Sequence, residues 1–296
     1  MPEAPSLRRR LARLRRHLIG SPPTPAPTAV RQDYFYLGPD LALKQLRDGR
    51  FLYVDPQDEH VSAVLIAFGA WEVDVQKAVR RLVRPGMRIV EVGANLGYYT
   101  MDMADLAGPT GHVTALEANP RLAAMVRRSA QFNGFLDRVS IIQKAASDRA
   151  GFLPFVISRT NSGGGYVDPW NDLSAYDDGE RLDVEAVRLD ELDLGRVDLI
   201  RTDAEGSEPA ILRGAEGLLR ANPDIQLCIE WDTIQMGSRS PVADLANWLS
   251  SLGFRFWVIE AGGDLIERPA SAMADVPPPC NLVLSREPPR LTRSLG

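Results

Sequence analysis

From Met87 onward, short apolar runs alternate along the chain with longer amphipathic stretches. The short runs have the length of strands buried on both faces, and the longer stretches repeat their apolar positions at a helical period. Strands that alternate with helices are typical of a mostly parallel sheet with helices on both faces. The pattern therefore predicts an α/β fold. The expected strands of a seven-stranded sheet are residues 88–92, 112–116, 139–143, 197–202, 225–230, 254–259 and 281–284, and the expected helices are residues 96–106, 120–132, 208–220 and 242–252.

Two segments depart from this alternation. Residues before the sheet contain one expected strand (51–54) and two expected helices (61–68 and 73–83), which we interpret as an N-terminal cap. Between the third and fourth sheet strands, extended segments at 152–157 and 182–189 flank a glycine-rich stretch. We expect this insertion to be partly mobile. With Tyr166 and Trp170, its segment Gly163-Gly-Gly165 could close as a lid over a sugar face, and the alternative is an unstructured surface loop.

The N-terminal segment is strongly basic. Arginines crowd its first sixteen residues, while Leu7, Leu11, Leu14 and Leu18 recur at helical spacing. Residues 7–18 therefore predict an amphipathic helix that lies on an anionic membrane surface or contacts a protein, or else a solvated tail. A proline-rich linker follows at 21–28. We expect a tail and linker (1–30), a cap (31–86), a domain built on the sheet (87–286) and a C-terminal tail (287–296).

Composition narrows the class of protein. The chain has 296 residues, of which 45% are hydrophobic, and a formal net charge of -5. This charge argues against a nucleic-acid partner, because phosphate binding needs a basic face. The sequence contains no apolar run long enough for a signal peptide or a membrane span, so we expect cytoplasmic residence, with the tail able to contact the inner membrane surface. The two cysteines support no disulfide framework.

A glycine loop follows the first strand of the predicted sheet. In Glu91-Val-Gly-Ala-Asn-Leu-Gly97, Gly93 would let a cofactor approach the backbone and Gly97 would let the next helix pack closely. Asn95 stands where the dinucleotide fingerprint has its second glycine, which disfavours NAD. The absence of a Tyr-x-x-x-Lys pair also argues against an NAD-dependent oxidoreductase. The Glu-x-Gly-x-x-x-Gly spacing is similar instead to the first motif of class I methyltransferases, whose loop wraps the amino-acid end of S-adenosylmethionine.

The next strands supply further candidates for an adenosine site. Glu117 ends the second strand, where a carboxylate can accept hydrogen bonds from both ribose hydroxyls, and the alternative is that it only caps the following helix. Ala118 follows it. Ala145 and Ala146 should border the adenine, with Asp148 as an acceptor for its amino group.

The segment from Asp198 to Glu208, Asp-Leu-Ile-Arg-Thr-Asp-Ala-Glu-Gly-Ser-Glu, resembles the Asp-x-Glu-Gly-x-Glu signature of the FkbM family of methyltransferases. Gly69-Ala-Trp-Glu72, Gly93-Ala-Asn-Leu-Gly-Tyr-Tyr-Thr100 and Ile229-Glu230 agree with that family, and the resemblance covers roughly residues 51–284. It implies a class I, Rossmann-like fold, S-adenosylmethionine as cofactor, and O-methylation of sugars, polysaccharides or related products. The cofactor-binding residues that we expect are Glu72, Glu91, Gly93, Ala94, Asn95, Gly97, Thr100, Glu117, Ala118, Ala145, Ala146 and Asp203.

Acids at the ends of the fourth and fifth strands are the candidate catalytic groups. A hydroxyl is a weak nucleophile, so a general base helps, and the three histidines are poorly placed for that role. We expect Glu205 or Glu230 to be the base, with Asp203 orienting cofactor or acceptor, although Glu205 and Glu208 could instead be first-turn acids of a helix. No Asn/Asp-Pro-Pro-Tyr turn follows the fourth strand, which argues against a nitrogen acceptor.

Two alternatives remain open from the sequence. Asp203, Glu230 and Asp232 could hold Mg²⁺, as in metal-dependent O-methyltransferases, but the family resemblance does not require a metal and Trp231 interrupts the acid pair. The chain could also be a non-catalytic module that binds a nucleoside or a glycan and is recruited through its basic helix. The concentration of acids beside the expected sulfonium argues against such a module.

Overall fold

The computed structural model describes residues 32–158, 160–168 and 179–292. Contacts divide the chain into two units, Met1–Asp33 and Tyr34–Gly296, and all described residues except Gln32 and Asp33 belong to the second unit. The predicted basic helix, the proline-rich linker, Trp170 and the end of the predicted C-terminal tail lie outside the described residues. None of the helices in the described part of the chain is both long enough and apolar enough to cross a membrane.

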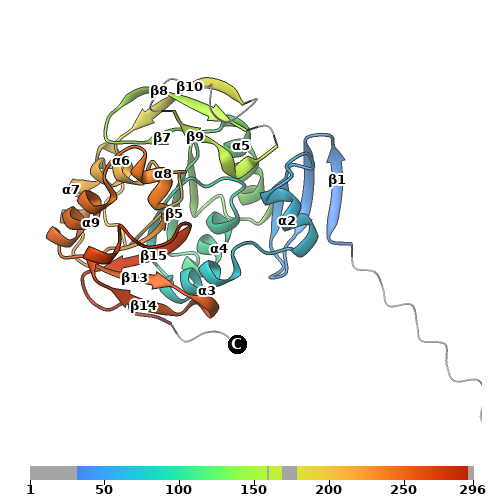
Figure 1. Cartoon of the computed structure of the whole chain (residues 1–296). Helices are drawn as coiled ribbons and strands as arrows, with labels where there is room; N and C mark the ends of the chain where they lie inside the picture. Colours follow the sequence, from blue (N-terminus) through green and yellow to red (C-terminus); the bar gives the residue numbers. More distant parts are fainter. Residues whose placement is uncertain (1–31, 159, 169–178, 293–296) are drawn as a thin grey trace, which may run out of the picture. The chain divides into compact units, whose positions relative to one another are not determined.

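An eight-stranded sheet is the centre of the second unit (Figure 1). Its strand order is β14-β13-β15-β12-β11-β4-β5-β6. The bounds are β4 Arg88–Val92, β5 His112–Leu116, β6 Val139–Ile142, β11 Leu199–Thr202, β12 Gln226–Trp231, β13 Arg255–Ile259, β14 Leu265–Arg268 and β15 Cys280–Ser285. The seven predicted strands are all present, and β14 extends the sheet at its edge, antiparallel to β13.

The direction of the strands locates the ligand-binding edge. The strands from β12 through β11, β4 and β5 to β6 are parallel, whereas β15 is antiparallel to both β12 and β13. The chain runs outward from β4 to β6 and then returns to place β11 on the other side of β4. Ligands of open α/β sheets bind beyond the carboxyl ends of the strands at such a switch point. The predicted α/β class, with a mostly parallel sheet, is confirmed.

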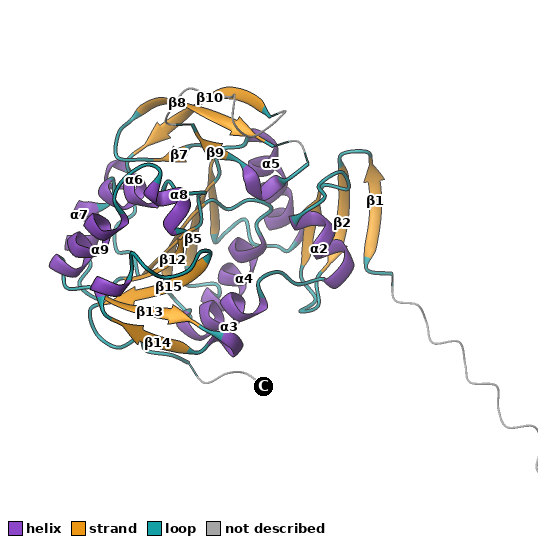
Figure 2. Ribbon diagram, viewed as in Figure 1, coloured by secondary structure: helices purple, strands orange, loops and turns teal. Residues whose placement is uncertain are grey.

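Helices cover both faces of the sheet (Figure 2). Neighbouring residues of β4 pack in two different hydrophobic clusters. Ile89 belongs to a cluster that includes residues of α3, α4 and α5. Val90 belongs to a cluster that includes residues of α6, α7 and α9. This double burial explains why the strands read as continuous apolar runs. The helices are α2 Val61–Phe68, α3 Val73–Leu82, α4 Tyr98–Ala107, α5 Pro120–Phe132, α6 Glu208–Arg213, α7 Glu216–Ala221, α8 Thr233–Gly237 and α9 Val242–Ser251.

The prediction of one helix over residues 208–220 was wrong, because the structure has α6 and α7 there. The break lies at Gly214, whose carbonyl accepts a hydrogen bond from the Asp190 amide (3.0 Å). The Asp190 carboxylate in turn accepts from the amides of Gly217 and Leu218, in the first turn of α7. A side chain at Gly214 would begin 1.9 Å from the carbonyl oxygen of Ser147. Contacts from a distant segment therefore end the first helix, against the local periodicity.

The N-terminal part of the second unit contains a small antiparallel sheet, β1 Tyr34–Gly38, β2 Leu41–Gln45 and β3 Phe51–Val54. Only β3 was predicted. Side chains of α5 and of the residue after it attach β3. The Asn133 side chain accepts a hydrogen bond from the Phe51 amide and donates one to the Phe51 carbonyl. The Ser129 hydroxyl accepts from the Tyr53 amide. These hydrogen bonds attach the small sheet to α5 and to the residue that follows it.

The insertion forms a third sheet of order β7-β10-β8-β9. Its strands are β7 Ala145–Ala146, β8 Gly151–Ile157, β9 Tyr166–Val167 and β10 Glu180–Val187, so both predicted extended segments are confirmed. The glycine-rich stretch is ordered by the cap, because the amide and hydroxyl of Ser162 both donate to the buried Asp58 carboxylate (3.2 and 2.6 Å). Its described residues include a short 3₁₀ helix, Ser162–Gly164.

Candidate active site

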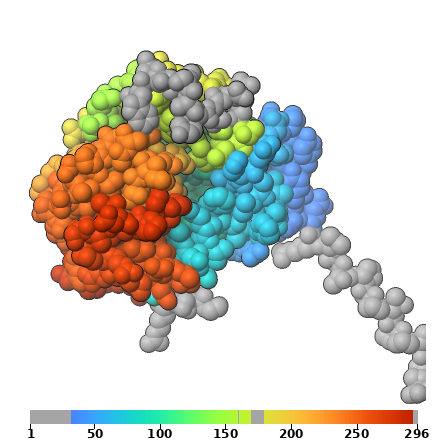
Figure 3. All heavy atoms as spheres, in the orientation of Figure 1, coloured from blue at the N-terminus to red at the C-terminus, as the bar shows by residue number. Residues whose placement is uncertain are grey.

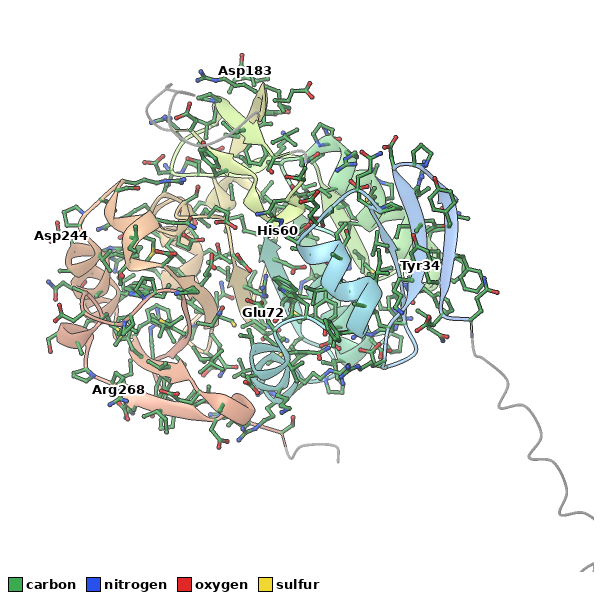
Figure 4. All side chains as sticks on the ribbon, turned by 45° about the vertical axis from the view of Figure 1, so that its right-hand side comes forward. Tyr34, His60, Glu72, Asp183, Asp244 and Arg268 are labelled. Atoms are coloured by element: carbon green, nitrogen blue, oxygen red, sulfur yellow. The ribbon has the colours of Figure 1, made fainter. Side chains whose placement is uncertain are left out.

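A cavity lies at the carboxyl ends of β4, β5, β11 and β12, where the strand order predicts a ligand. The insertion contributes part of its wall through Phe155, Ser162 and Gly163. Glu72, which stands directly before α3 and is labelled in Figure 4, also lines the cavity. The predicted residues that line this cavity are Glu72, Gly93, Asn95, Glu117, Ala118, Ala145, Ala146, Asp203, Glu205 and Glu230.

The glycine loop, residues 93–97, is held by backbone contacts. The amides of Gly93 and Ala94 both donate to the Leu116 carbonyl (3.0 and 3.1 Å). Gly93 has a φ of 80°, and a side chain there would begin 1.9 Å from the carbonyl oxygen of Asp203. Glycine is therefore required at position 93 because the backbone of Asp203 approaches it closely, and not because a cofactor does. Gly97 begins α4 with a φ of 85° and lies against Val126 of α5.

Glu117 supports this loop from the next strand. Its two carboxylate oxygens accept hydrogen bonds from the amides of Asn95 (2.7 Å) and Asn119 (2.8 Å). The side chain of Asn119, which sequence reasoning missed, caps α5, so Glu117 is not the helix cap. An ionised carboxylate has about four acceptor positions, which leaves Glu117 able to accept from ribose hydroxyls. Burial raises the pKa of Glu117 to about 7.

Glu91 and Thr100 lie behind the loop and do not line the cavity. Both are buried, and the Thr100 hydroxyl donates to the Glu91 carboxylate (2.5 Å). Burial raises the pKa of Glu91 to about 7. Ala94 lines only a small neighbouring cavity. The structure thus places Glu91 and Thr100 where they support the loop, without exposing them to the cofactor space.

Sequence reasoning missed Arg201, a buried cation on β11. Its guanidinium lies 2.9 Å from the Asp203 carboxylate and 3.6 Å from that of Glu91, and it stacks 3.8 Å from the centre of the Tyr99 ring. The Tyr99 hydroxyl donates to Glu72 (3.0 Å). A charge removed from water needs such partners. An arginine inside an apolar strand, Leu-Ile-Arg-Thr, is the sequence signal that could have found it.

Three carboxylates, Asp203, Glu205 and Glu230, form an acid cluster in which one oxygen of each lies within 4.8 Å of the others. Burial and the neighbouring charge of Asp203 raise the pKa of Glu230 to about 11, so it keeps its proton in the free protein. Burial raises the pKa of Glu205 to about 7 despite a hydrogen bond from Gln235 that favours its ionised form. Two acids of one cluster therefore differ in protonation at neutral pH.

Side chains from α8 and the segment after it position Glu205. The Gln235 amide donates to its carboxylate (2.8 Å), and Arg239 donates to its backbone carbonyl (2.7 Å). Glu205 has a φ of 50°, in the left-handed region. Among the described residues, the only others that combine a side chain with such a φ are Glu72 and Asn95, which also line the cavity. Strained backbone of this kind is retained where the surrounding structure enforces it, often at functional sites.

Three other predicted acids are placed differently. Glu208 is buried at the start of α6, where its carboxylate accepts from the Ala204 amide (2.7 Å), in keeping with the first-turn alternative. Asp232 caps α8 by accepting from the amides of Ile234 and Gln235. Asp148 lines an adjoining groove and not the cofactor cavity. The carboxylates that could bind a divalent ion at this edge are therefore those of Asp203, Glu205 and Glu230. The Asp232 carboxylate is not among them, because it caps α8.

The model of the methyltransferase FkbM domain matches residues 91–256, a span that contains the glycine loop and the acid cluster. The chain belongs to the FkbM family of S-adenosylmethionine-dependent methyltransferases. Within this family, the eight-stranded sheet is a class I methyltransferase sheet with an added edge strand.

Other methyltransferases resemble this FkbM-family chain over parts of its length. Protein-L-isoaspartate O-methyltransferase of Hyperthermus butylicus is 39% identical over 67 residues, which cover 20% of this chain and 28% of that protein. Catechol O-methyltransferase of Mycobacterium tuberculosis is 28% identical over 170 residues, covering 57% and 68%. The solved structure of methyltransferase FkbM from Methylobacillus flagellatus is 13% identical with a TM-score of 0.45, covering 78% of this chain and 62% of that one. The chain thus spans little more than a quarter of the first of these relatives.

The residues of the cavity fit S-adenosylmethionine, the cofactor of the family. The side-chain oxygen of Asn95 is buried at the cavity and has no hydrogen-bond partner among the described residues. Buried acceptors almost always have a hydrogen-bond partner, so a ligand or a water is expected to donate to this oxygen. Glu72, Glu117 and Asp203 line the same cavity and offer carboxylate oxygens to a ligand with donor or cationic groups.

Proposed function

We propose that the protein transfers a methyl group from S-adenosylmethionine to a hydroxyl oxygen of a sugar, a polysaccharide or a related natural product. The observation that supports this best is the acid cluster, which puts proton acceptors beside the cofactor cavity. The sugar class rests on the family resemblance, whose members methylate such products. The catechol O-methyltransferases among the relatives also act on oxygen, as their name states.

In this proposal the cavity orients the cofactor along its length. Ala145, Ala146 and Phe155, which line the cavity, would border the adenine, Glu117 would accept from the ribose, and Glu72 with Asp203 would face the ammonium group. When bound, the cofactor supplies an electrophilic methyl group on a sulfonium. Correct alignment of the acceptor can contribute on the order of 7 to 11 kcal/mol to the rate.

Glu205 is then the better candidate for the general base. As the acceptor oxygen forms its bond to the methyl carbon and the carbon–sulfur bond breaks, the hydroxyl proton passes to a Glu205 carboxylate oxygen. A base is most effective when its pKa lies near the working pH. Burial raises the pKa of Glu205 to about 7, whereas burial and the charge of Asp203 raise that of Glu230 much further. Glu230 can donate a hydrogen bond to the acceptor.

Calorimetric titration with S-adenosylmethionine tests the proposal, with NAD in parallel and with Mg²⁺ or a chelator in each run. We expect S-adenosylmethionine to bind under both conditions and NAD to bind under neither. Glu117→Gln should weaken this binding, whereas Glu205→Gln should leave it unchanged. Binding that required Mg²⁺ would favour the metal-assisted mechanism through Asp203, Glu205 and Glu230. A protein that bound no S-adenosylmethionine would be better explained as a non-catalytic module.

A further inference from the structure

A second cavity of about 540 Å³ adjoins the cofactor cavity and has no role in the proposed chemistry so far. It lies between the insertion and the helices α6 and α9, whose green-yellow and orange surfaces adjoin in Figure 3. The two cavities share three wall residues, Ala146, Val167 and Ser207. Its size falls within the range of about 300 to 1,000 Å³ that is usual for ligand pockets. We call this second cavity the side groove.

The charged side chains that line the side groove balance one another, beside a wall that is otherwise largely apolar. A hydroxyl of a sugar can donate and accept at once, so such a wall can bind a ligand with many hydroxyls. A fully apolar ligand would remove water from the charged groups on this wall without offering them hydrogen bonds, which costs free energy. A strongly anionic ligand would meet the carboxylates. The charged wall residues are three arginines, Arg149, Arg213 and Arg239, and three acids, Asp148, Asp168 and Asp244.

Arg239 connects the side groove to the proposed base. It lines the groove, donates to the Ser207 hydroxyl on the shared wall, and donates to the carbonyl of Glu205 (2.7 Å). Its buried Nε has no hydrogen-bond partner in the described part of the chain. A ligand in the groove therefore lies against the residue that holds Glu205 in its left-handed conformation.

We propose that the side groove is the acceptor subsite and that it binds a neutral, polyhydroxylated acceptor, such as one or more sugar units. The bulk of the acceptor lies between the insertion and α9, where Asp244 is labelled in Figure 4, and one hydroxyl reaches past Ser207 to Glu205. This inference rests on the proposed function, because it assigns the acceptor of that reaction.

Filling the groove tests the assignment without changing the cofactor cavity. Ala210 on α6 is half-buried and lines only the groove, so Ala210→Trp should occupy it. Ala243→Trp is the matched control, since Ala243 is exposed on the adjacent helix α9 and lines neither cavity. Asp244→Asn, at an exposed position in the first turn of α9, is a milder variant that guards against misfolding of Ala210→Trp.

Saturation-transfer NMR with neutral methyl glycosides, in the presence of S-adenosylhomocysteine, gives the readout. Wild type and Ala243→Trp should bind a neutral glycoside, Ala210→Trp should bind it at least about 10-fold more weakly, and Asp244→Asn about 2- to 10-fold more weakly. Absence of glycoside binding by the wild type, a preference for glucuronate or catechol, or unchanged binding by both groove variants would overturn the assignment. Titration of the same proteins with S-adenosylmethionine separates this result from failure of the proposed function, which predicts binding in all of them.

Discussion

The glycine loop and the acid cluster face one cavity, but they are held by different kinds of contact. The loop is held through its own backbone amides, those of Gly93 and Ala94 on the Leu116 carbonyl and that of Asn95 on the Glu117 carboxylate. The acid cluster depends on side chains that come from elsewhere in the chain, since Gln235 and Arg239 lie 30 and 34 residues beyond Glu205. A change in the loop should therefore disturb the structure itself. A change around the acid cluster should alter the chemistry while the fold persists.

The largest expected effect is that of Gly93→Ala. Its Cβ would begin 1.9 Å from the Asp203 carbonyl at a φ that L-residues rarely adopt, so backbone must move. We expect the free energy of unfolding to fall by at least about 3 kcal/mol, and cofactor binding to be lost. Urea unfolding followed by circular dichroism measures this. The control is Gly108→Ala, which also has a positive φ (67°) but open space around it. Equal losses in the two variants would show that the close contact is unimportant.

Glu205→Gln should have the next largest effect, and on turnover alone. Removal of a general base lowers the rate about 100- to 10,000-fold, while affinity for S-adenosylmethionine should stay within about 2-fold. A steady-state assay with a radiolabelled methyl group, together with calorimetry, separates the two quantities. If Glu205→Gln turned over at the wild-type rate, the base would have to be Glu230 or be replaced by a metal-bound group.

The pH dependence of the reaction should follow Glu205. The pKa of Glu205 is raised to about 7, and only the ionised form can accept a proton, so kcat/KM should be low below about pH 6 and rise with pH through about 7. A profile measured from about pH 5 to 9 in overlapping buffers tests this. A rate independent of pH across that range would argue against a carboxylate base.

Gln235→Ala should have a moderate effect on kcat and on its pH dependence, and so tests whether side chains around the acid cluster control its chemistry. Its side chain donates to the Glu205 carboxylate and so favours the ionised form. Without that hydrogen bond we expect kcat to fall about 10-fold and the midpoint of the pH profile to move upward. The Ile234→Ala variant, at an exposed neighbouring position on α8, should leave both unchanged. A fall in kcat with an unmoved midpoint would indicate only a loss of structure.

Tyr99→Phe should have the smallest effect. It retains the ring beneath Arg201 and removes the hydroxyl that donates to Glu72. If Glu72 faces the ammonium end of the cofactor, affinity for S-adenosylmethionine should fall about 2- to 10-fold with kcat little changed. Calorimetry on the folded variant measures the difference. Unchanged affinity would remove Glu72 from the proposed cofactor contacts.

The sequence by itself determined the central sheet and the position of its chemistry. Strand periodicity, the turn at Gly93 and the start of α5 at Pro120 are local features, so seven of the eight strands of the central sheet could be predicted. The carboxyl ends of parallel strands meet at one edge, which brings Asp203 and Glu230 together. Family resemblance added the cofactor.

Only the tertiary structure decided the finer roles. Asp190 and Ser147 break the helix after Arg213, and Thr100 turns inward to Glu91 behind the loop. Asp232 caps α8, and the Gln235 side chain donates a hydrogen bond to the Glu205 carboxylate. The partners of Asp232 are only two and three residues away, but the other outcomes depend on which partner a polar group contacts once separate segments pack. Hydrogen bonds and buried charges are settled by those partners, whereas periodicity reports only which face of an element is buried.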